Sequence, residues 1–360
     1  MRARMLAAAC TALAILPSAC TDGSPPVAPA ESEVLGADLG AWVGGLPRHP
    51  WRAPSGPPVL VGAGDIARCY DPEDPTDITP PAATAAEATA RLLDRIPGTV
   101  MAIGDNAYEF GSPLDYALCY EPTWGRHRGR TRPAAGNHEY LTPGAAGYFA
   151  YFGLRAAPPL GWYSYDLGSW HVVVLNSTPQ VYACWPPEIE EGRPPDFPSP
   201  PPVPDEPGPA AGRACAGDVA QQAWLAADLA ANPARCTVAY FHHSRYSSAR
   251  HGNHYQMQRI WDILYAHGVD VVVSAHDHVY ERFAPQDSDA RLDETRGIRQ
   301  FVAGTGGAEL YEFEEIEPNS EVRLDDTHGV LALALGRGRY GWAFVAVDGG
   351  VRDSGTDECT

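Results

Sequence analysis

Two histidines, His276 and His278, stand on alternate positions directly after a valine-rich stretch, residues 269–273. A run of branched apolar residues predicts a buried strand, so two imidazoles emerge where a strand meets a loop. Ligands of open α/β sheets bind at such strand ends. Imidazole is a common metal ligand, so the pair is a candidate metal site, although an isolated H-x-H pair more often decorates a surface.

Oxygen-bearing side chains and further imidazoles follow the same pattern elsewhere. Four short motifs, three of them at the ends of apolar stretches, are GDIA at 64–67, GDNAY at 104–108, GNHE at 136–139 and HH at 242–243. Carboxylate oxygens mixed with imidazoles suit first-row transition metals. A bridging carboxylate would hold two metals about 3.5–4 Å apart, the spacing that clamps both ends of an in-line phosphoryl displacement.

The elements that must position these motifs alternate between strand and helix. Apolar residues at helical spacing and strand-like apolar stretches predict three helices, over residues 82–93, 221–231 and 255–266, and further strands over 170–175, 299–303, 330–335 and 342–347. This alternation predicts an α/β protein with a mixed, largely parallel strand arrangement.

Composition excludes several classes of function. All 26 basic residues are arginine, and the absence of lysine excludes P-loop NTPases, protein kinases, Schiff-base enzymes and S-x-x-K acyl enzymes. The net charge of -19 argues against a nucleic acid partner, because such surfaces need clustered basic residues.

The first 55 residues predict export rather than a folded core. Residues 1–20 combine Arg2 and Arg4 with a short apolar stretch and resemble a bacterial export signal. The sequence before Cys20 is an imperfect lipobox, so a secreted protein and one lipid-anchored at Cys20 on the outer face of a bacterial membrane are the two alternatives. Residues 21–55 predict a disordered, proline-rich tether, and residues 56–360 the catalytic domain.

Six cysteines follow the export signal. In an oxidising compartment this even number predicts three disulfides, which could be connected in fifteen different ways. They are Cys69, Cys119, Cys184, Cys215, Cys236 and Cys359. Residues 184–215 are so rich in proline that they predict an insertion without regular structure. A disulfide between Cys184 and Cys215 would close that loop and limit its entropy, so we expect this pair.

The ordered series of motifs resembles the calcineurin-like metallophosphoesterases and, more narrowly, the purple acid phosphatases. The resemblance covers roughly residues 57–360. It implies a two-sheet β sandwich flanked by helices in four layers, αββα. It also implies a binuclear metal centre at which a metal-bound hydroxide attacks phosphorus, without an amino-acid nucleophile. Ala67 and Ala275 replace glycines usual in the family's motifs, but all donor atoms stay in place.

The same resemblance assigns the site residues. It places Asp65, Asp105, Tyr108 and His278 on the first metal; Asp105, Asn137, His242 and His276 on the second; and His138 and His251 beside the phosphate ester. Taken singly, the two aspartates could be helix caps, Asn137 a turn residue and His242 a core histidine. His243 and His254 receive no assignment.

Tyr108 bears on the identity of the metals. Metallophosphoesterases generally carry D-x-H in the first motif, and here the histidine position is Ala67, which has no donor atom. Tyr108, three residues after Asp105, could supply the missing contact. A phenol with a pKa near 10 ionises in acid only against a strong Lewis acid. The expected cofactors are therefore Fe(III) and one divalent ion, Zn, Mn or Fe.

These expectations combine into an exported binuclear phosphoric monoester hydrolase of the acid phosphatase type, acting on small phosphate esters. Two alternatives stay open. The metal ligands do not choose between monoesters and diesters, so a phosphodiesterase or nucleotide pyrophosphatase on the same scaffold is one. A non-catalytic envelope protein with structural metals is the other, although such a protein would not need His138 as a leaving-group acid.

Overall fold

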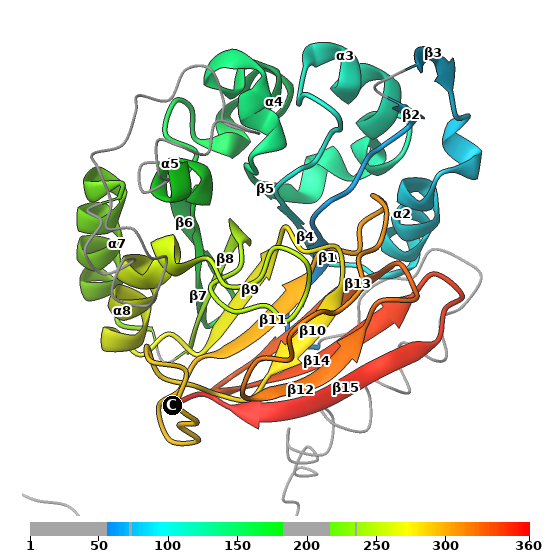
Figure 1. The fold of residues 1–360 in the computed structure, drawn as a ribbon. Coiled ribbons are helices and arrows are strands. Elements are labelled where there is room, and N and C mark those ends of the chain that lie inside the picture. Colours follow the sequence, from blue (N-terminus) through cyan, green and yellow to red (C-terminus); the bar gives the residue numbers. More distant parts are fainter. Residues whose placement is uncertain (1–55, 72–73, 183–216, 235) are drawn as a thin grey trace, which may run out of the picture.

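The computed structural model describes residues 56–71, 74–182, 217–234 and 236–360 (Figure 1). The predicted export signal, the tether, the insertion at 184–215 and the expected disulfide between Cys184 and Cys215 lie outside these residues. No helix in the described residues is long and apolar enough to cross a bilayer.

Two large sheets form the centre of the protein. The first has the order β15-β14-β13-β1-β4-β5, with β1 at Val59–Ala63, β4 at Thr99–Ile103, β5 at Thr131–Ala134, β13 at Gly329–Gly336, β14 at Arg339–Ala346 and β15 at Val351–Glu358. The second has the order β12-β10-β11-β9-β8-β7-β6, with β6 at Tyr163–Leu167, β7 at Trp170–Val174, β8 at Cys236–His243, β9 at Val271–Ala275, β10 at Tyr280–Phe283, β11 at Arg299–Ala303 and β12 at Ser320–Leu324. A small separate ribbon pairs β2 (Tyr70–Asp71) with β3 (Asp74–Ile78).

Helices connect the strands. The α-helices are α2 (Ala85–Arg95), α3 (Pro113–Asp115), α4 (Ala146–Phe152), α5 (Ser177–Tyr182), α7 (Val219–Ala231) and α8 (Gln258–Ala266). Short 3₁₀ or π segments are η1 (Pro81–Ala83), η2 (Tyr116–Tyr120), η3 (Trp124–Arg130), η4 (His138–Leu141), η5 (Pro143–Ala145), η6 (Gly153–Ala156) and η7 (Tyr255–Met257).

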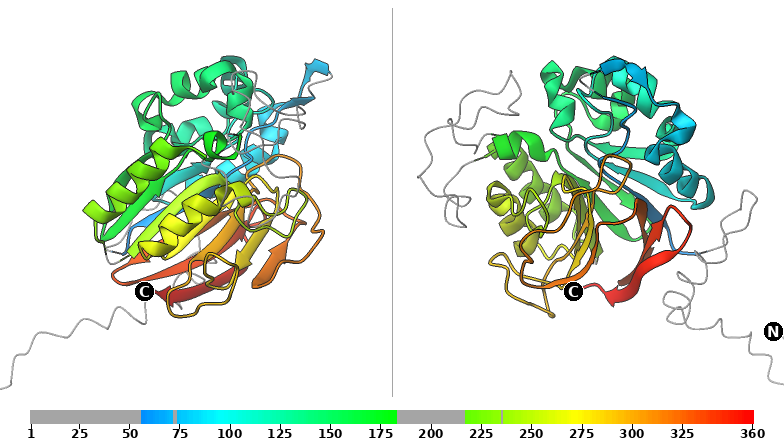
Figure 2. Two further views of the ribbon diagram at one scale, coloured as in Figure 1. Left: turned by 60° about the vertical axis from the view of Figure 1, so that its left-hand side comes forward. Right: turned by 45° about the vertical axis from the view of Figure 1, so that its right-hand side comes forward.

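Alternation of side chains along the strands creates the layers. In β1 and β4, Leu60 and Met101 enter the core between the two sheets, whereas Val61 and Val100 enter a second core beneath α2 and α4. A third core packs β8 and β9 against α7 and α8. Figures 1 and 2 show α7 and α8 on one side of the sheets and α2 on the other. The predicted four-layer sandwich is therefore confirmed.

Both sheets are mixed, as predicted, but parallel pairing is confined to one side of the first sheet and to the centre of the second. β1, β4 and β5 run parallel in the first sheet, and β7, β8, β9 and β11 in the second. The remaining neighbours are antiparallel. The expectation of a largely parallel arrangement is therefore too broad, because antiparallel hairpins such as β13–β14–β15 build much of the rest of the sheets.

The predicted helices and strands occur with small shifts of their ends. The helix predicted over 82–93 begins at Ala85, because the Thr84 side chain accepts a hydrogen bond from the Glu87 amide and caps the helix. Residues 221–231 lie in α7, and 255–266 divide into η7 and α8. The four further predicted strands correspond to β7, β11, β13 and β14.

Candidate metal centre

The predicted ligands gather where the parallel strands of the two sheets end. By strand, they are Asp65 after β1, Asp105 and Tyr108 after β4, Asn137 after β5, His242 as the second-last residue of β8, and His276 and His278 after β9. Parallel strands bring their carboxyl ends to one edge of a sheet. Because both sheets present that edge to the same place, residues more than 200 positions apart in the chain come into contact.

Local backbone conformation turns three of these side chains into the site. Asp65, Asp105 and His276 have positive φ angles of 57°, 47° and 72°. Such conformations cost a non-glycine residue on the order of 1–3 kcal/mol each and persist where the surroundings impose them. His276 directly follows β9, and Asp65 and Asp105 are the second residues after β1 and β4. The sharp turn at each of these positions bends the backbone at the strand end, so that the side chain faces the site.

The first donor set consists of four buried side chains. The Tyr108 hydroxyl lies 2.9 Å from Asp65 Oδ1, 3.2 Å from His278 Nε2 and 3.3 Å from Asp105 Oδ2. His278 Nε2 is also 3.4 Å from Asp65 Oδ1. Atoms that share one cation at bond lengths of about 2.0–2.2 Å lie about 3–3.5 Å apart. The Tyr108 hydroxyl therefore lies at ligand-like spacing from the other three donor atoms, and His278 from Asp65.

The second donor set is centred on His242. Its Nε2 lies 3.1 Å from Asp105 Oδ2, 3.1 Å from Asn137 Oδ1 and 3.2 Å from His276 Nδ1. These distances also match those between ligands of one cation. Asp105 Oδ2 belongs to both sets, so the geometry is that of two adjoining sites with a common carboxylate oxygen.

Neighbouring groups fix which atom of each ligand faces the site. The Asp65 Oδ2 atom accepts the His276 amide at 2.9 Å, and Asp105 Oδ1 accepts the His138 amide at 2.8 Å, which leaves the other oxygen of each carboxylate for a cation. His242 Nδ1 donates to a backbone carbonyl, that of Ile103, at 2.9 Å. Such outer contacts fix ring orientation and tautomer in metal sites.

The charges of the site also suit a cation. The charged partners of Asp65 and Asp105 in the described residues are histidines, and no arginine pairs with either carboxylate. Two buried carboxylates without a permanent cation are costly unless a metal or proton compensates them. The residues present therefore fit a metal centre.

The pKa values follow from this crowding. Burial would raise the pKa of Asp105, but His242 and His138 hold it well below its usual range. Burial would lower the pKa of His242, but Asp105 and Asp65 raise it to about 9. Burial and the charge of Asp65 raise the pKa of Tyr108 well above 10, so its phenol is neutral until a cation compensates the phenolate.

The two predicted catalytic histidines lie on different sides of the donor sets. His138 Nδ1 donates to the Glu109 carbonyl at 2.6 Å, and its Nε2 lies 3.8 Å from Asp105 Oδ2. The ring of His251 stacks on that of His276, with centroids 4.3 Å apart, and is exposed. The structure therefore brings both histidines to the edge of the centre.

Sequence analysis missed the role of Glu139. This carboxylate is fully buried and accepts hydrogen bonds from the amides of Asp105, Asn106 and Gly136 at 2.9, 2.8 and 2.7 Å. It thereby ties the loop after β4 to the loop after β5. Glu139 is part of the GNHE motif. The sequence could not distinguish it from an exposed glutamate, because its role depends on hydrogen bonds to amides of another loop.

Two glycines allow the loops to approach this closely. A Cβ on Gly136 would lie 2.1 Å from Asp105 Oδ1, and a Cβ on Gly104 would lie 2.6 Å from His242 Nδ1. Gly104 also has a φ of 81°, which favours glycine. Both glycines of the motifs therefore serve the close packing of the ligands themselves.

The four-layer fold and its convergent carboxylates and imidazoles are those expected of the metallophosphoesterase class. The family model of calcineurin-like phosphoesterases matches residues 64–280, more than half of the chain, and the chain belongs to this family. The prediction of a metallophosphoesterase fold is therefore confirmed, and membership of this family supports the predicted phosphoester hydrolase. No curated protein sequence matches the chain significantly.

Solved structures share the fold at low sequence identity. Purple acid phosphatase PPD1 from yellow lupin (Lupinus luteus) seeds aligns with a TM-score of 0.56 and 19% identity over 86% of this chain, which spans only 55% of the lupin chain. GAP50, the anchor in the inner membrane complex of Plasmodium, aligns with a TM-score of 0.56 and 13% identity, over 85% of this chain and 90% of its own. PhoD aligns with a TM-score of 0.52 and 12% identity, over 87% of this chain and 72% of its own.

Proposed function

We propose that this protein is a binuclear metallophosphatase of the acid phosphatase type, which hydrolyses phosphoric monoesters. The observation that carries the proposal is the pair of donor sets that share Asp105 Oδ2, each with ligand-like spacing. A structural metal site needs one closed set of ligands, whereas two adjoining sets with a shared carboxylate are the arrangement of two-metal phosphoryl chemistry.

A bound pair of cations would supply an activated water and positive charge for the phosphoryl oxygens. The chain's own residues would do the rest. Asp65 and Asp105 offset the charge of the cations, and the outer hydrogen bonds of the ligands keep the donor atoms aligned. His138 has one nitrogen fixed by the Glu109 carbonyl, so its Nε2 is the atom that can give a proton to a leaving alkoxide.

Fe(III) with a divalent ion, Zn, Mn or Fe, is the proposed metal pair. The support comes from Tyr108, whose hydroxyl lies among Asp65, Asp105 and His278 rather than in an apolar contact. Its raised pKa means that only a strong Lewis acid would hold it as phenolate near neutral pH. The other donors are oxygen and imidazole, which suit either ion.

Export is part of the proposal. Disulfides join Cys69 to Cys119 and Cys236 to Cys359, and such bonds persist in oxidising compartments. With the signal-like residues 1–20, they support a secreted protein or one anchored by lipid at Cys20 on the outer face of a bacterial membrane. The two forms differ in mass by the lipid, which mass spectrometry of the exported protein would detect.

The test combines metal analysis with a panel of monoesters, diesters and nucleotide pyrophosphates. We expect at least two metals per chain and the highest kcat/KM with monoesters. Asp105→Ala should lose both metals and hydrolysis, because the shared oxygen is gone, while the exposed control Asp326→Ala should keep both.

Each alternative has its own signature in this experiment. A preference for diesters or pyrophosphates would contradict the monoesterase assignment and leave the binuclear centre. Two bound metals without hydrolysis of any ester would instead indicate the non-catalytic protein. Retention of both metals by Asp105→Ala would refute the shared ligand.

A further inference from the structure

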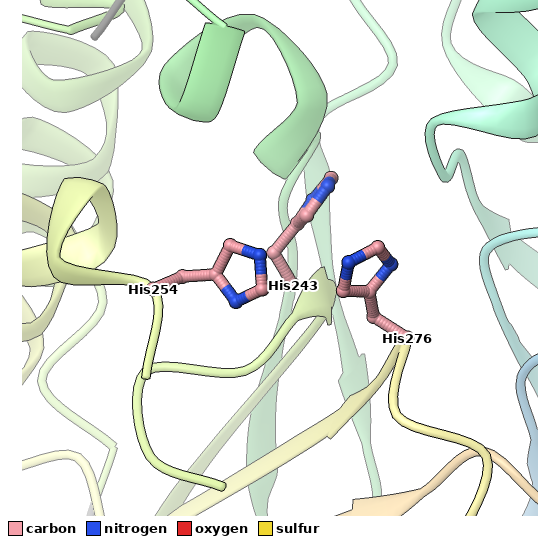
Figure 3. Close-up of side chains that lie close together, drawn as sticks. All are labelled: His243, His254 and His276. Carbon is pink, nitrogen blue, oxygen red and sulfur yellow. The ribbon is translucent and has the colours of Figure 1, made fainter. Parts of the chain in front are cut away.

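His276 has two faces, and only one of them belongs to the metal centre described above. Its Nδ1 lies 3.2 Å from His242 Nε2, in the second donor set. Its other nitrogen points the opposite way, toward the rings of His243 and His254 (Figure 3). The ring centroids of His243 and His254 lie 4.5 and 4.9 Å from that of His276. The imidazoles of His243, His254 and His276 thus lie close together on the side of His276 that faces away from His242.

The outer nitrogen of His276 is unlike those of the other ligand histidines. His242 and His278 each use the outer nitrogen to donate to a backbone carbonyl, at 2.9 and 2.5 Å. In the described part of the chain, Nε2 of His276 makes no hydrogen bond, and the residues opposite it are two imidazoles instead of a carbonyl. A metal-ligating histidine almost always has a partner for this nitrogen.

The other two histidines are also oriented for a ligand. His243 is buried, and its Nδ1 pairs with Ser177 Oγ at 2.8 Å, which leaves Nε2 as its remaining donor atom. His254 is 6% exposed, and its Nδ1 has no hydrogen-bond partner in the described residues. One nitrogen from each of the three rings lies within 4.8 Å of the other two, yet no hydrogen bond joins them. An atom placed between the rings could therefore bind all three.

We propose that His243, His254 and His276 form a third metal site that takes a divalent cation of the zinc class. Three imidazoles without a carboxylate select zinc or a similar transition metal over magnesium or calcium. Three protein ligands also leave a fourth position open, as in catalytic zinc sites. His276 would bridge the third cation and the second one, so its ring must lose its N–H proton to solvent when both are bound.

Zinc content is the direct test, and it does not depend on the catalytic role proposed above. Metal-free protein would be loaded with Zn(II), passed through a desalting column and analysed by mass spectrometry for zinc per chain. We expect three zinc ions in the wild type and two in His254→Gln, which keeps a polar side chain of similar size. His267→Gln, at an exposed histidine after α8, is the matched control and should keep three.

Circular dichroism melting would verify that His254→Gln is folded. An independent measurement uses the wild type alone: diffraction at the zinc absorption edge should give an anomalous peak among the three rings. Two zinc ions in the wild type, or three in both proteins, would overturn the third site. The first of these results would leave the binuclear proposal intact, so the two proposals can fail separately.

Discussion

At the scale of single residues, Asp65 and Asp105 each use one carboxylate oxygen to accept a backbone amide and leave the other for a cation. One of these amides belongs to His138, so this contact helps to position His138. The amide of His138 binds Asp105 Oδ1, while its side chain is fixed by Glu109. His138→Ala should therefore keep both metals and lower kcat by about 10²–10⁴-fold for esters with poor leaving groups. The loss should shrink for nitrophenyl esters, whose leaving groups need no proton. A loss that is equal across leaving groups would remove His138 from the acid role.

Tyr108 allows a spectroscopic prediction. A phenolate on Fe(III) absorbs visible light, so protein exported with iron supplied should be purple or pink, and Tyr108→Phe should be colourless. The substitution keeps the ring, which packs 4.5 Å from that of His138, and removes only the hydroxyl. The measurement is the visible spectrum together with iron content.

Two results would contradict this assignment in different ways. Stoichiometric iron without a band that depends on Tyr108 would exclude the phenolate. Full activity with divalent metals alone would exclude the purple subclass and leave the family assignment unchanged. Tyr311→Phe is the matched control, because its ring stacks on His278, 4.0 Å between centroids, outside the donor sets.

At the scale of elements, Glu139 joins the loops that follow β4 and β5. Glu139→Ala would leave three buried amides without acceptors, at about 1–3 kcal/mol each. We expect a markedly lower melting temperature and a loss of about 10–100-fold in metal affinity, as for other outer partners of metal ligands. Glu294→Ala, at an exposed glutamate, should change neither. Unchanged metal affinity in folded Glu139→Ala would show that the loops hold their positions without it.

The elements that carry ligands could be predicted from the sequence, because buried parallel strands are continuous apolar stretches. β15 could not: its residues VRDSGTDE are mostly polar. Its pairing with β14 is set by the hairpin turn before it, where Gly349 has a φ of 87°. The role of Glu139 also escaped, since it depends on a contact between two loops. Motif order predicted which residues meet, but not the positive φ angles that orient them.

At the scale of the whole molecule, the disulfide between Cys236 and Cys359 connects the two sheets. Cys236 begins β8 of the second sheet, and Cys359 follows β15 at the edge of the first. Removal of a native disulfide typically costs about 2–5 kcal/mol. The double variant Cys236→Ser with Cys359→Ser should therefore unfold at a lower urea concentration with unchanged metal content, because both cysteines lie outside the donor sets. An unchanged urea midpoint would show that packing between the sheets suffices.

The last prediction concerns stability with and without metal as the pH rises. In the metal-free protein the pKa of His242 is about 9, and Asp65 also raises that of His278 against the effect of burial. A pKa raised above the unfolded value near 6.5 gives stability that is complete below pH 6.5 and is lost as the pH rises through 9. For His242 the loss amounts to about 3 kcal/mol. Burial raises the pKa of Asp277 to about 6, so the contribution of Asp277 to stability changes below pH 6.5 and does not affect the range from 6.5 to 9.

Bound metal changes this dependence, because a ligating imidazole cannot also carry a proton on the same nitrogen. The loaded protein should therefore lack the loss between pH 6.5 and 9. The gain in melting temperature on adding metal should grow across this range and level off above pH 9. Calorimetric scans of metal-free and loaded protein at several pH values would measure it, with His267→Gln as a control for an unrelated histidine. A gain that is constant from pH 6.5 to 9 would mean that His242 is not protonated in the metal-free site, and that the Asp105–His242 pair does not compete with the metal.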